Sequence, residues 1–145
     1  MKTAQLQRAL QWHRDTSSIF KGVFPANKLP TIPKNKTLAI IANTDPSHRP
    51  GQHWVAFFFK REHVYFFDSY GQKPQKAEFH KLMMCRKYKH FFGRRIQGSG
   101  KECGFYCLYF ILSMVQGKSF DIFGDDLNAN DRCVRNIVQK HFEIF

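Results

Sequence analysis

Two apolar segments separated by four polar residues constrain the fold of this chain more than any other feature. His53–Phe59 and Val64–Asp68 consist almost entirely of apolar and aromatic residues, and Lys60–His63 lie between them. Short runs of this composition indicate β-strands, and so short a connection favours a hairpin. Pairing through residues 61–63 would place His53 and Asp68 at the same end of the sheet. Leu38–Ala42 is a further candidate for a buried strand.

Helical spacing of apolar residues predicts the other elements. We expect helices over residues 3–13, from Pro74 through the basic stretch that ends near Lys89, over residues 99–115, and over residues 131–141 with Asn128 or Asn130 as a cap. Residues 20–36 contain three prolines and are expected to form an extended loop, and residues 94–97 a short strand. The order of helix, strands, helix, strand, helix and helix indicates an α+β fold.

Length and composition exclude several classes of protein. A chain of 145 residues is expected to form one domain spanning 1–145. Hydrophobic residues make up 43% and aromatic residues 16%, which excludes a disordered chain. No apolar run approaches the ~20 residues that a membrane span requires. The first fifteen residues lack an apolar stretch, so we expect no secretory signal peptide.

The chain is strongly basic. Lys and Arg number 23 against 11 Asp and Glu, which gives a formal net charge of +12. Such a charge favours a polyanionic partner, namely nucleic acid, an anionic membrane or an acidic protein, and solubility alone is the alternative explanation.

The four cysteines are Cys85, Cys103, Cys107 and Cys133. Without a visible signal peptide, we expect them to be reduced rather than paired in disulfides. Cys103 and Cys107 would share one face of a helix, but no CxxC or HxxxH element supplies the further ligands that a zinc site needs. We therefore predict no metal site.

Four polar residues stand out by their positions along the chain. His53 opens one apolar strand and Asp68 closes its partner, while Gln97 precedes a glycine-rich turn and Cys103 begins the most apolar helix. Each also has an ordinary structural explanation, as a strand-end histidine, a turn-forming aspartate or a core cysteine. Together, in this order, they match the requirements of a thiol protease.

The chemistry of a thiol protease explains why these residue types belong together. The nucleophile is a thiolate, which a helix N-terminus and a neighbouring imidazolium both stabilise. A carboxylate holds the imidazole in one tautomer and orientation. A side-chain amide and a backbone N–H at the helix start can supply the donors for the tetrahedral oxyanion, roles that suit Gln97 and the N–H of Cys103.

Three segments resemble the adenovirus endopeptidase (adenain) family, of the clan that includes the SUMO and ubiquitin-like proteases. They are Gly51–Phe59 with its His-Trp pair, Val64–Gly71 with its Asp-Ser-Tyr-Gly sequence, and Gln97–Cys107 with its Cys-Gly-x-x-Cys sequence. The resemblance covers roughly residues 20–115. It implies a mixed central sheet flanked by helices, with the catalytic cysteine at the N-terminus of a central helix.

The resemblance also implies a role for individual residues. His53, Asp68 and Cys103 would form the catalytic triad, and Gln97 would contribute to the oxyanion hole. Trp54 would wall a narrow slot that admits a glycine-containing substrate, with Gly51 and Gly104 as further substrate-binding residues.

Two features depart from the adenovirus pattern. The third triad residue is Asp68, as in the SUMO proteases, where the adenovirus enzymes usually have Glu, and the chain is shorter than theirs. Both departures favour an adenovirus-related virus or a virus-like transposon of the Polinton or adintovirus type as the source.

The resemblance further implies two activators, DNA and a short basic peptide joined by a disulfide, and no small-molecule cofactor. Cys85 lies in the corresponding stretch, although an ordinary helix thiol is the favoured explanation for it. A basic cluster interleaved with aromatic residues is the candidate DNA-binding surface, and a solvated helix face is the alternative. We assign to it Lys81, Arg86, Lys87, Lys89, Arg94 and Arg95.

The sequence therefore predicts a monomeric viral cysteine endopeptidase that cleaves virion precursor proteins after glycine, in the virion and in the host nucleus or cytoplasm. A protease of SUMO or ubiquitin-like modifiers is the first alternative. An inactive protease-like domain that binds nucleic acid is the second, and the intact set of His53, Asp68, Gln97 and Cys103 argues against it.

Overall fold

A computed structural model describes residues 2–44, 53–98 and 101–142. Four helices and five strands are found there, in the order α1 (Thr3–Trp12), β1 (Phe20–Pro25), β2 (Leu38–Asn43), β3 (Trp54–Lys60), β4 (His63–Phe67), α2 (Ala77–Met83), β5 (Tyr88–Phe91), α3 (Cys103–Gln116) and α4 (Leu127–His141). This order matches the predicted α+β arrangement.

The five strands form one mixed sheet in the order β1-β2-β3-β4-β5. The central pairs β2–β3 and β3–β4 are antiparallel, and the two edge strands, β1 and β5, run parallel to their neighbours. The predicted hairpin is confirmed, because Lys60 pairs with His63 across a tight turn in which Arg61 has a φ of 53°.

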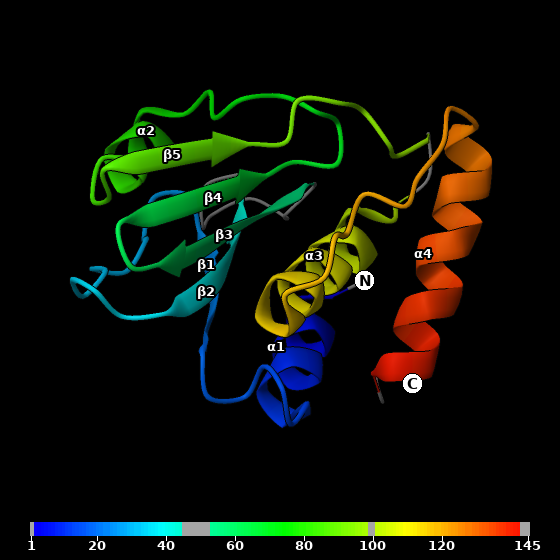
Figure 1. The fold of residues 1–145 in the computed structure, drawn as a ribbon, viewed down its shortest axis with the longest axis horizontal. Helices are drawn as coiled ribbons and strands as arrows, with labels where there is room; N and C mark the ends of the chain where they lie inside the picture. The colour runs from blue at the N-terminus through cyan, green and yellow to red at the C-terminus, as the bar shows by residue number, and fades with distance from the viewer. Residues whose placement is uncertain (1, 45–52, 99–100, 143–145) are drawn as a thin grey trace.

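Both faces of the sheet are covered, which explains why its central strands are apolar at nearly every position. Phe58 and Ile41 point toward one core, which α1, α3 and α4 cover, and Phe57 and Ile40 point toward the other, which α2 covers. Figure 1 shows α2 on one side of the sheet and the three longer helices on the other. Helix α3 packs against β3, and the thiol of Cys107 in its second turn lies 3.4 Å from the carbonyl oxygen of Trp54, so the N-terminus of α3 lies near the strand end that carries His53.

The first difference from the predicted elements is β1. The sequence predicts an extended loop over residues 20–36, yet Phe20–Pro25 pairs with β2. Pro25 is the last residue of an edge strand, where its missing N–H disrupts no ladder. Prolines in this segment therefore end the strand rather than prevent it.

The second difference concerns the basic segment after α2. The helix ends at Met83, so Cys85 lies in the following turn and not on a helix, and residues 88–91 form β5. The ring of His63 stacks on Tyr88 and that of Tyr65 on His90, contacts between strands that no local pattern reveals. Residues 94–97 are irregular and do not form the predicted strand.

The last helix begins one turn earlier than predicted. Its N-cap is Asp126, whose side chain accepts a hydrogen bond from the N–H of Ala129 at 3.1 Å. Asn128 and Asn130 therefore lie inside the helix rather than at its cap. None of the helices in the described ranges is long and apolar enough to cross a membrane.

Arg86 is an interior residue, contrary to its predicted role in DNA binding. Its side chain is 5% exposed, and its guanidinium donates hydrogen bonds to the carbonyls of Arg61, Pro33 and Lys36. It also lies 5.4 Å from the centre of the Phe59 ring. Arg86 thus joins the β3–β4 turn to the loop before β2, and its donors are not available to a phosphate.

We predict that Arg86→Met lowers the free energy of unfolding by roughly 2–4 kcal/mol, because buried carbonyl groups lose their donor at about 1–3 kcal/mol each and part of that loss is recovered by water. Thermal or urea denaturation measures the change. Lys87→Met, at the exposed neighbour, is the matched control and should change stability little. Equal stability of the two variants would contradict a structural role for Arg86.

Candidate active site

The end of the β3–β4 hairpin brings the predicted histidine and aspartate together. His53 precedes β3 and Asp68 follows β4, and the register that pairs Ala56 with Phe67 brings them to the same end of the sheet. His53 Nε2 lies 2.7 Å from Asp68 Oδ1, and both side chains are largely buried. The expected juxtaposition is therefore confirmed.

Asp68 forms a turn and orients the histidine at the same time. Its Oδ1 also accepts a hydrogen bond from the N–H of Tyr70 at 2.9 Å, and its carbonyl accepts one from the N–H of Gly71 at 2.8 Å. The turn fixes the carboxylate relative to the backbone before it reaches the imidazole. The two interpretations of this residue, turn former and triad member, are compatible.

Glycine is required at position 71. Its φ is 74°, and a Cβ there would lie 2.5 Å from the backbone carbon of Arg94. This close approach places the turn after β4 directly against residues 94–95. The segment that carries Gln97 is therefore docked on the turn that carries Asp68.

Cys103 is the first residue of α3 and is 4% exposed. The N–H groups of the first helical turn have no partner within the helix, so the helix start presents donors and the positive end of its dipole. His53 Nε2 is committed to Asp68, and His53 Nδ1 is buried with no other hydrogen bond in the described segments. Cys103 also interacts with the His53 ring, and because Asp68 binds Nε2, Nδ1 is the nitrogen left for the thiol.

The surroundings of His53 favour its charged form. Burial lowers its pKa, but hydrogen bonding to Asp68 and to Cys103, together with the charges of both groups, outweighs burial and raises the pKa from 6.5 to about 9. The ring also stacks on Tyr70, with centroids 4.6 Å apart and planes at 17°. This arrangement suits an imidazolium beside a thiolate.

Gln97 lies in the irregular segment before α3 and is 1% exposed. The N–H groups of Ile96 and Gln97 both donate to the carbonyl of Ser69, and the Ser69 hydroxyl donates a short hydrogen bond to Gln97 Oε1. Because Oε1 accepts from Ser69, the amide nitrogen is the end that can donate to an oxyanion.

The predicted substrate-binding residues flank these groups. Trp54 opens β3 and is 8% exposed, with its side chain in the core beneath the sheet, and Gly104 is buried in the first turn of α3. Gly51 lies outside the described residues. A cavity of about 370 Å³ lies beside the His53–Asp68 pair; its lining includes Tyr70, Lys73 and Lys76.

The other cysteines do not share the surroundings of Cys103. Cys107 is fully buried, its thiol donates to the carbonyl of Trp54 at 3.4 Å, and burial raises its pKa well above the usual value. Cys85 is exposed and Cys133 half-buried, and the four thiols form no disulfide. Within the described ranges no group of three or more His, Cys, Asp or Glu residues could hold a metal ion.

Two further arginines of the predicted DNA-binding cluster are committed to internal contacts. Arg94 donates to Asp121 and to the carbonyls of Phe123 and Gly124. Arg95 donates to the carbonyls of Gln97 and Gly98 at 2.9 and 3.3 Å, and its guanidinium lies 4.9 Å from the centre of the Tyr70 ring. The exposed members that remain are Lys81, Lys87 and Lys89.

The sequence did not indicate several residues that shape this site. Ser69 and Tyr70 lie within the Asp-Ser-Tyr-Gly motif, so their position was visible but their contacts with Gln97 and His53 were not. Asp131 comes from α4 and accepts a hydrogen bond from the N–H of Gly98. No spacing in the sequence links residue 131 to residue 98, because the contact depends on how α4 packs.

No protein-family model matches the chain. A protein of Acanthamoeba polyphaga mimivirus, named as a candidate thiol protease, is 33% identical over 96 residues, which is 58% of this chain and 32% of the relative. Two crystal structures of the ASFV pS273R protease are similar in fold. One has a TM-score of 0.59 at 18% identity, covering 92% of this chain and 65% of the other, and the second has 0.51 at 24%, covering 74% and 46%.

These similarities show that the chain has a cysteine protease fold. The chain spans about a third of the mimivirus relative and about half to two thirds of the ASFV structures. The predicted fold, an α+β domain with the cysteine at the start of a central helix, is therefore confirmed.

We predict that the His53 imidazole titrates with a midpoint near pH 9 in NMR spectra of the folded protein. Because the folded pKa lies above the unfolded value of 6.5, the stabilisation is fully present below pH 6.5 and is lost as the pH rises through 9. Burial lowers the His53 pKa, and the hydrogen bond to Asp68 is the largest contribution that raises it. In Asp68→Asn the titration midpoint of His53 should therefore fall. A wild-type midpoint near 6.5 would contradict the arrangement.

Proposed function

We propose that this chain is a cysteine endopeptidase domain in which Cys103 is the nucleophile, His53 the acid and base, Asp68 the orienting carboxylate and Gln97 an oxyanion donor. The observation that carries the proposal is the position of His53. One ring nitrogen bonds Asp68 at 2.7 Å, and the other faces Cys103 at the start of α3. The similarity to the mimivirus thiol protease and the shared fold support the same chemistry.

The reaction follows from these roles. The Cys103 thiolate attacks the carbonyl carbon of the scissile peptide bond, and the carbonyl oxygen becomes an oxyanion held by the Gln97 amide and the N–H of Cys103. His53 then gives its proton to the leaving amine, and the C–N bond breaks to leave a thioester. Water attacks the thioester while His53 takes up its proton, and the C–S bond then breaks, which releases the acid and restores the thiolate beside a protonated His53.

The proposed substrates are precursor proteins of a virion, cleaved after glycine. Viral origin is supported by the mimivirus relative and by the ASFV protease of the same fold. The preference for glycine rests on the resemblance of the His-Trp and Gln…Cys segments to adenain, with Trp54 next to His53. The proposed sites of action are the virion and the nucleus or cytoplasm of the host cell. A SUMO or ubiquitin-like modifier is the alternative substrate.

We predict that the wild-type protein cleaves one member of a panel of precursors, each with a glycine before the scissile bond: a glycine-containing viral precursor peptide, a SUMO precursor and a ubiquitin precursor. Cys103→Ala should abolish cleavage and keep the fold, since only one sulfur is lost from a buried position. Cys133→Ala is the matched control and should retain activity. Mass spectrometry of the products identifies the bond that is cut.

The result distinguishes the substrates as well as the function. Cleavage of the viral peptide alone supports the precursor protease, and cleavage of a modifier alone supports the alternative. Activity that survives Cys103→Ala would refute the assignment of the nucleophile.

We also propose that non-specific DNA binding and a disulfide-linked activating peptide regulate the protein. The net charge of +12 and the exposed Lys81, Lys87 and Lys89 support DNA binding, and Lys87 Nζ lies 5.3 Å from the centre of the Tyr88 ring. Exposure of Cys85 in the turn after α2 supports its access to a peptide thiol. Arg86, Arg94 and Arg95 are omitted, because their guanidinium groups bind protein carbonyls.

We predict that replacing Lys81, Lys87 and Lys89 together by Glu weakens binding to duplex DNA of any sequence. The slope of log K against log salt should become shallower by up to about 2.7, or ~0.9 for each phosphate that a lysine no longer neutralises. Replacing the exposed Lys21, Lys28 and Lys34 by Glu changes the net charge equally and is the control. Equal weakening in both variants would show that only net charge matters.

A further inference from the structure

The N-terminal half of α4 lies against the segment that carries Gln97. Asp131 is 8% exposed, and both of its carboxylate oxygens lie 3.1 Å from the backbone nitrogen of Gly98, which donates to them. The Tyr106 hydroxyl, from α3, donates to Asp131 Oδ1 at 2.6 Å. The carboxylate therefore connects α4, α3 and the residue directly after Gln97.

A side chain at position 98 would crowd this contact. A Cβ there would lie 2.8 Å from Asp131 Oδ2 and 2.9 Å from Asn128 Oδ1, closer than real Cβ contacts come. The missing side chain lets the Gly98 backbone reach the carboxylate directly. The close approach of α4 thus favours glycine over a larger residue at position 98.

The residue on the other side of Gln97 is held by the same helix. Asn130 Nδ2 donates to the carbonyl of Ile96 at 3.1 Å and to that of Gly124 at 2.9 Å, and Asn130 Oδ1 accepts from the N–H of Gly124 at 3.0 Å. Asn130 is 4% exposed, so these bonds are shielded from water. Two successive residues of α4 therefore bind the backbone before and after Gln97.

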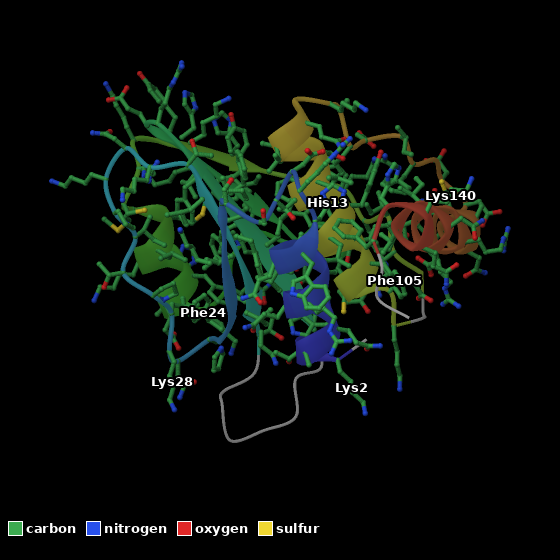
Figure 2. All side chains as sticks on the ribbon, turned by 90° about the horizontal axis from the view of Figure 1, so that it is seen from below. Lys2, His13, Phe24, Lys28, Phe105 and Lys140 are labelled. Atoms are coloured by element: carbon green, nitrogen blue, oxygen red, sulfur yellow. The ribbon has the colours of Figure 1, made fainter. Side chains whose placement is uncertain are left out.

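The next turn of α4 reaches the start of α3. Arg135 forms a short ion pair with the buried carboxylate of Glu102, the residue before Cys103, and lies 5.8 Å from the centre of the Phe105 ring. Figure 2 shows Phe105 on the side of α3 that faces α4. One helix thus contacts both segments that supply the proposed oxyanion donors.

We propose that Asp131 is a positioning residue that fixes the Gln97 amide in the oxyanion hole by holding the Gly98 backbone. The inference rests on the proposed function. Asp131 does not act on substrate itself, because its oxygens are engaged with Gly98 and Tyr106, whereas Cys103 faces His53. Residues 94–97 have no regular secondary structure, so the side chains around them determine where Gln97 lies.

Preorganisation is the reason that such a residue matters for rate. An oxyanion donor lowers the barrier only when it already points to where the charge will develop, and removal of one donor costs about 10²–10³ in kcat. A small displacement of Gln97 would forfeit part of that factor and leave the nucleophile intact. Loss of the Asp131 carboxylate should therefore weaken oxyanion stabilisation by Gln97 and leave the reactivity of the Cys103 thiol unchanged.

The test compares Asp131→Asn with wild type, with Gln97→Ala as the reference for a missing donor. Asparagine keeps the shape but presents an NH₂ group to one of the two donors. Asp126→Asn is the matched control, because it makes the same change on the same helix, at a cap whose carboxylate accepts a hydrogen bond from the N–H of Ala129 and, in the described structure, does not bind the segment of Gln97. Three quantities are measured: kcat and KM for the cleaved peptide, the Kd of the corresponding peptide aldehyde, and the rate of Cys103 alkylation by iodoacetamide.

We expect Asp131→Asn to lower kcat by roughly 10- to 100-fold, within the limit set by removal of a whole donor, with KM nearly unchanged. The aldehyde should bind more weakly by a similar factor, because its hemithioacetal oxygen uses the same donors. Alkylation needs no oxyanion hole and should keep its wild-type rate. Asp126→Asn should match wild type in all three.

Other outcomes overturn the inference. Unchanged kcat and aldehyde affinity in Asp131→Asn would show that Asp131 is only structural, and an equal fall in alkylation would show general disruption of the site. A wild type that neither cleaves peptide nor binds the aldehyde would refute the proposed function itself.

A second variant keeps the test available if Asp131→Asn does not fold. Tyr106→Phe removes the hydroxyl that lies 2.6 Å from Asp131 Oδ1 and 3.2 Å from the carbonyl oxygen of Ile96, and it leaves the contact between Asp131 and Gly98 in place. It should reduce kcat and aldehyde affinity in parallel but by less, again at the wild-type alkylation rate. A Tyr106→Phe variant with wild-type kcat and aldehyde affinity would count against the inference.

Discussion

The hydrogen bond between His53 and Asp68 depends on the register of a single hairpin, and the rest of the site is arranged around it. A shift of one residue between β3 and β4 would turn every side chain of one strand to the opposite face and would separate the two groups. The two apolar cores prevent such a shift, because Phe57 and Phe58 belong to different ones. The catalytic geometry that we propose is thus maintained by the same apolar burial that stabilises the sheet.

The arginines show that charge alone does not identify a binding surface. Arg86 joins two loops through three carbonyl groups, and Arg94 binds the segment before α4. Arg95 lies over the Tyr70 ring and donates to the carbonyls of Gln97 and Gly98. A guanidinium has five donors in a rigid plane, so it can bridge several backbone carbonyls where the chain is irregular. The lysines nearby have no such geometry, so the basic cluster divides into arginines that bind the protein's own carbonyls and exposed lysines that do not.

The Gln97–Gly98 segment is irregular, yet it is held from several directions. Ser69 binds it from the turn after β4, and Arg95 binds it from the residues just before it. From α4, Asn130 binds the preceding carbonyl of Ile96 and Asp131 binds the N–H of Gly98. This network makes α4 part of the proposed active site although it carries none of the residues that would touch substrate. The proposed oxyanion donor is thus held from both the turn after β4 and α4, whereas the His53–Asp68 pair is set by the hairpin alone.

The sequence by itself determined the central hairpin, the helices, the α+β class, and the four residues proposed to carry the chemistry. Apolar runs and their spacing are local signals, and His53, Asp68, Gln97 and Cys103 lie at the ends of elements that those signals define. Only the tertiary structure decided that residues 20–25 and 88–91 are edge strands, because an edge strand is specified by the neighbour with which it pairs. It also decided that Arg86 is buried, and that Asp131 meets Gly98 thirty-three residues away along the chain. Those contacts arise from packing between segments far apart in the chain, and the periodic spacing of apolar residues reports only on local structure.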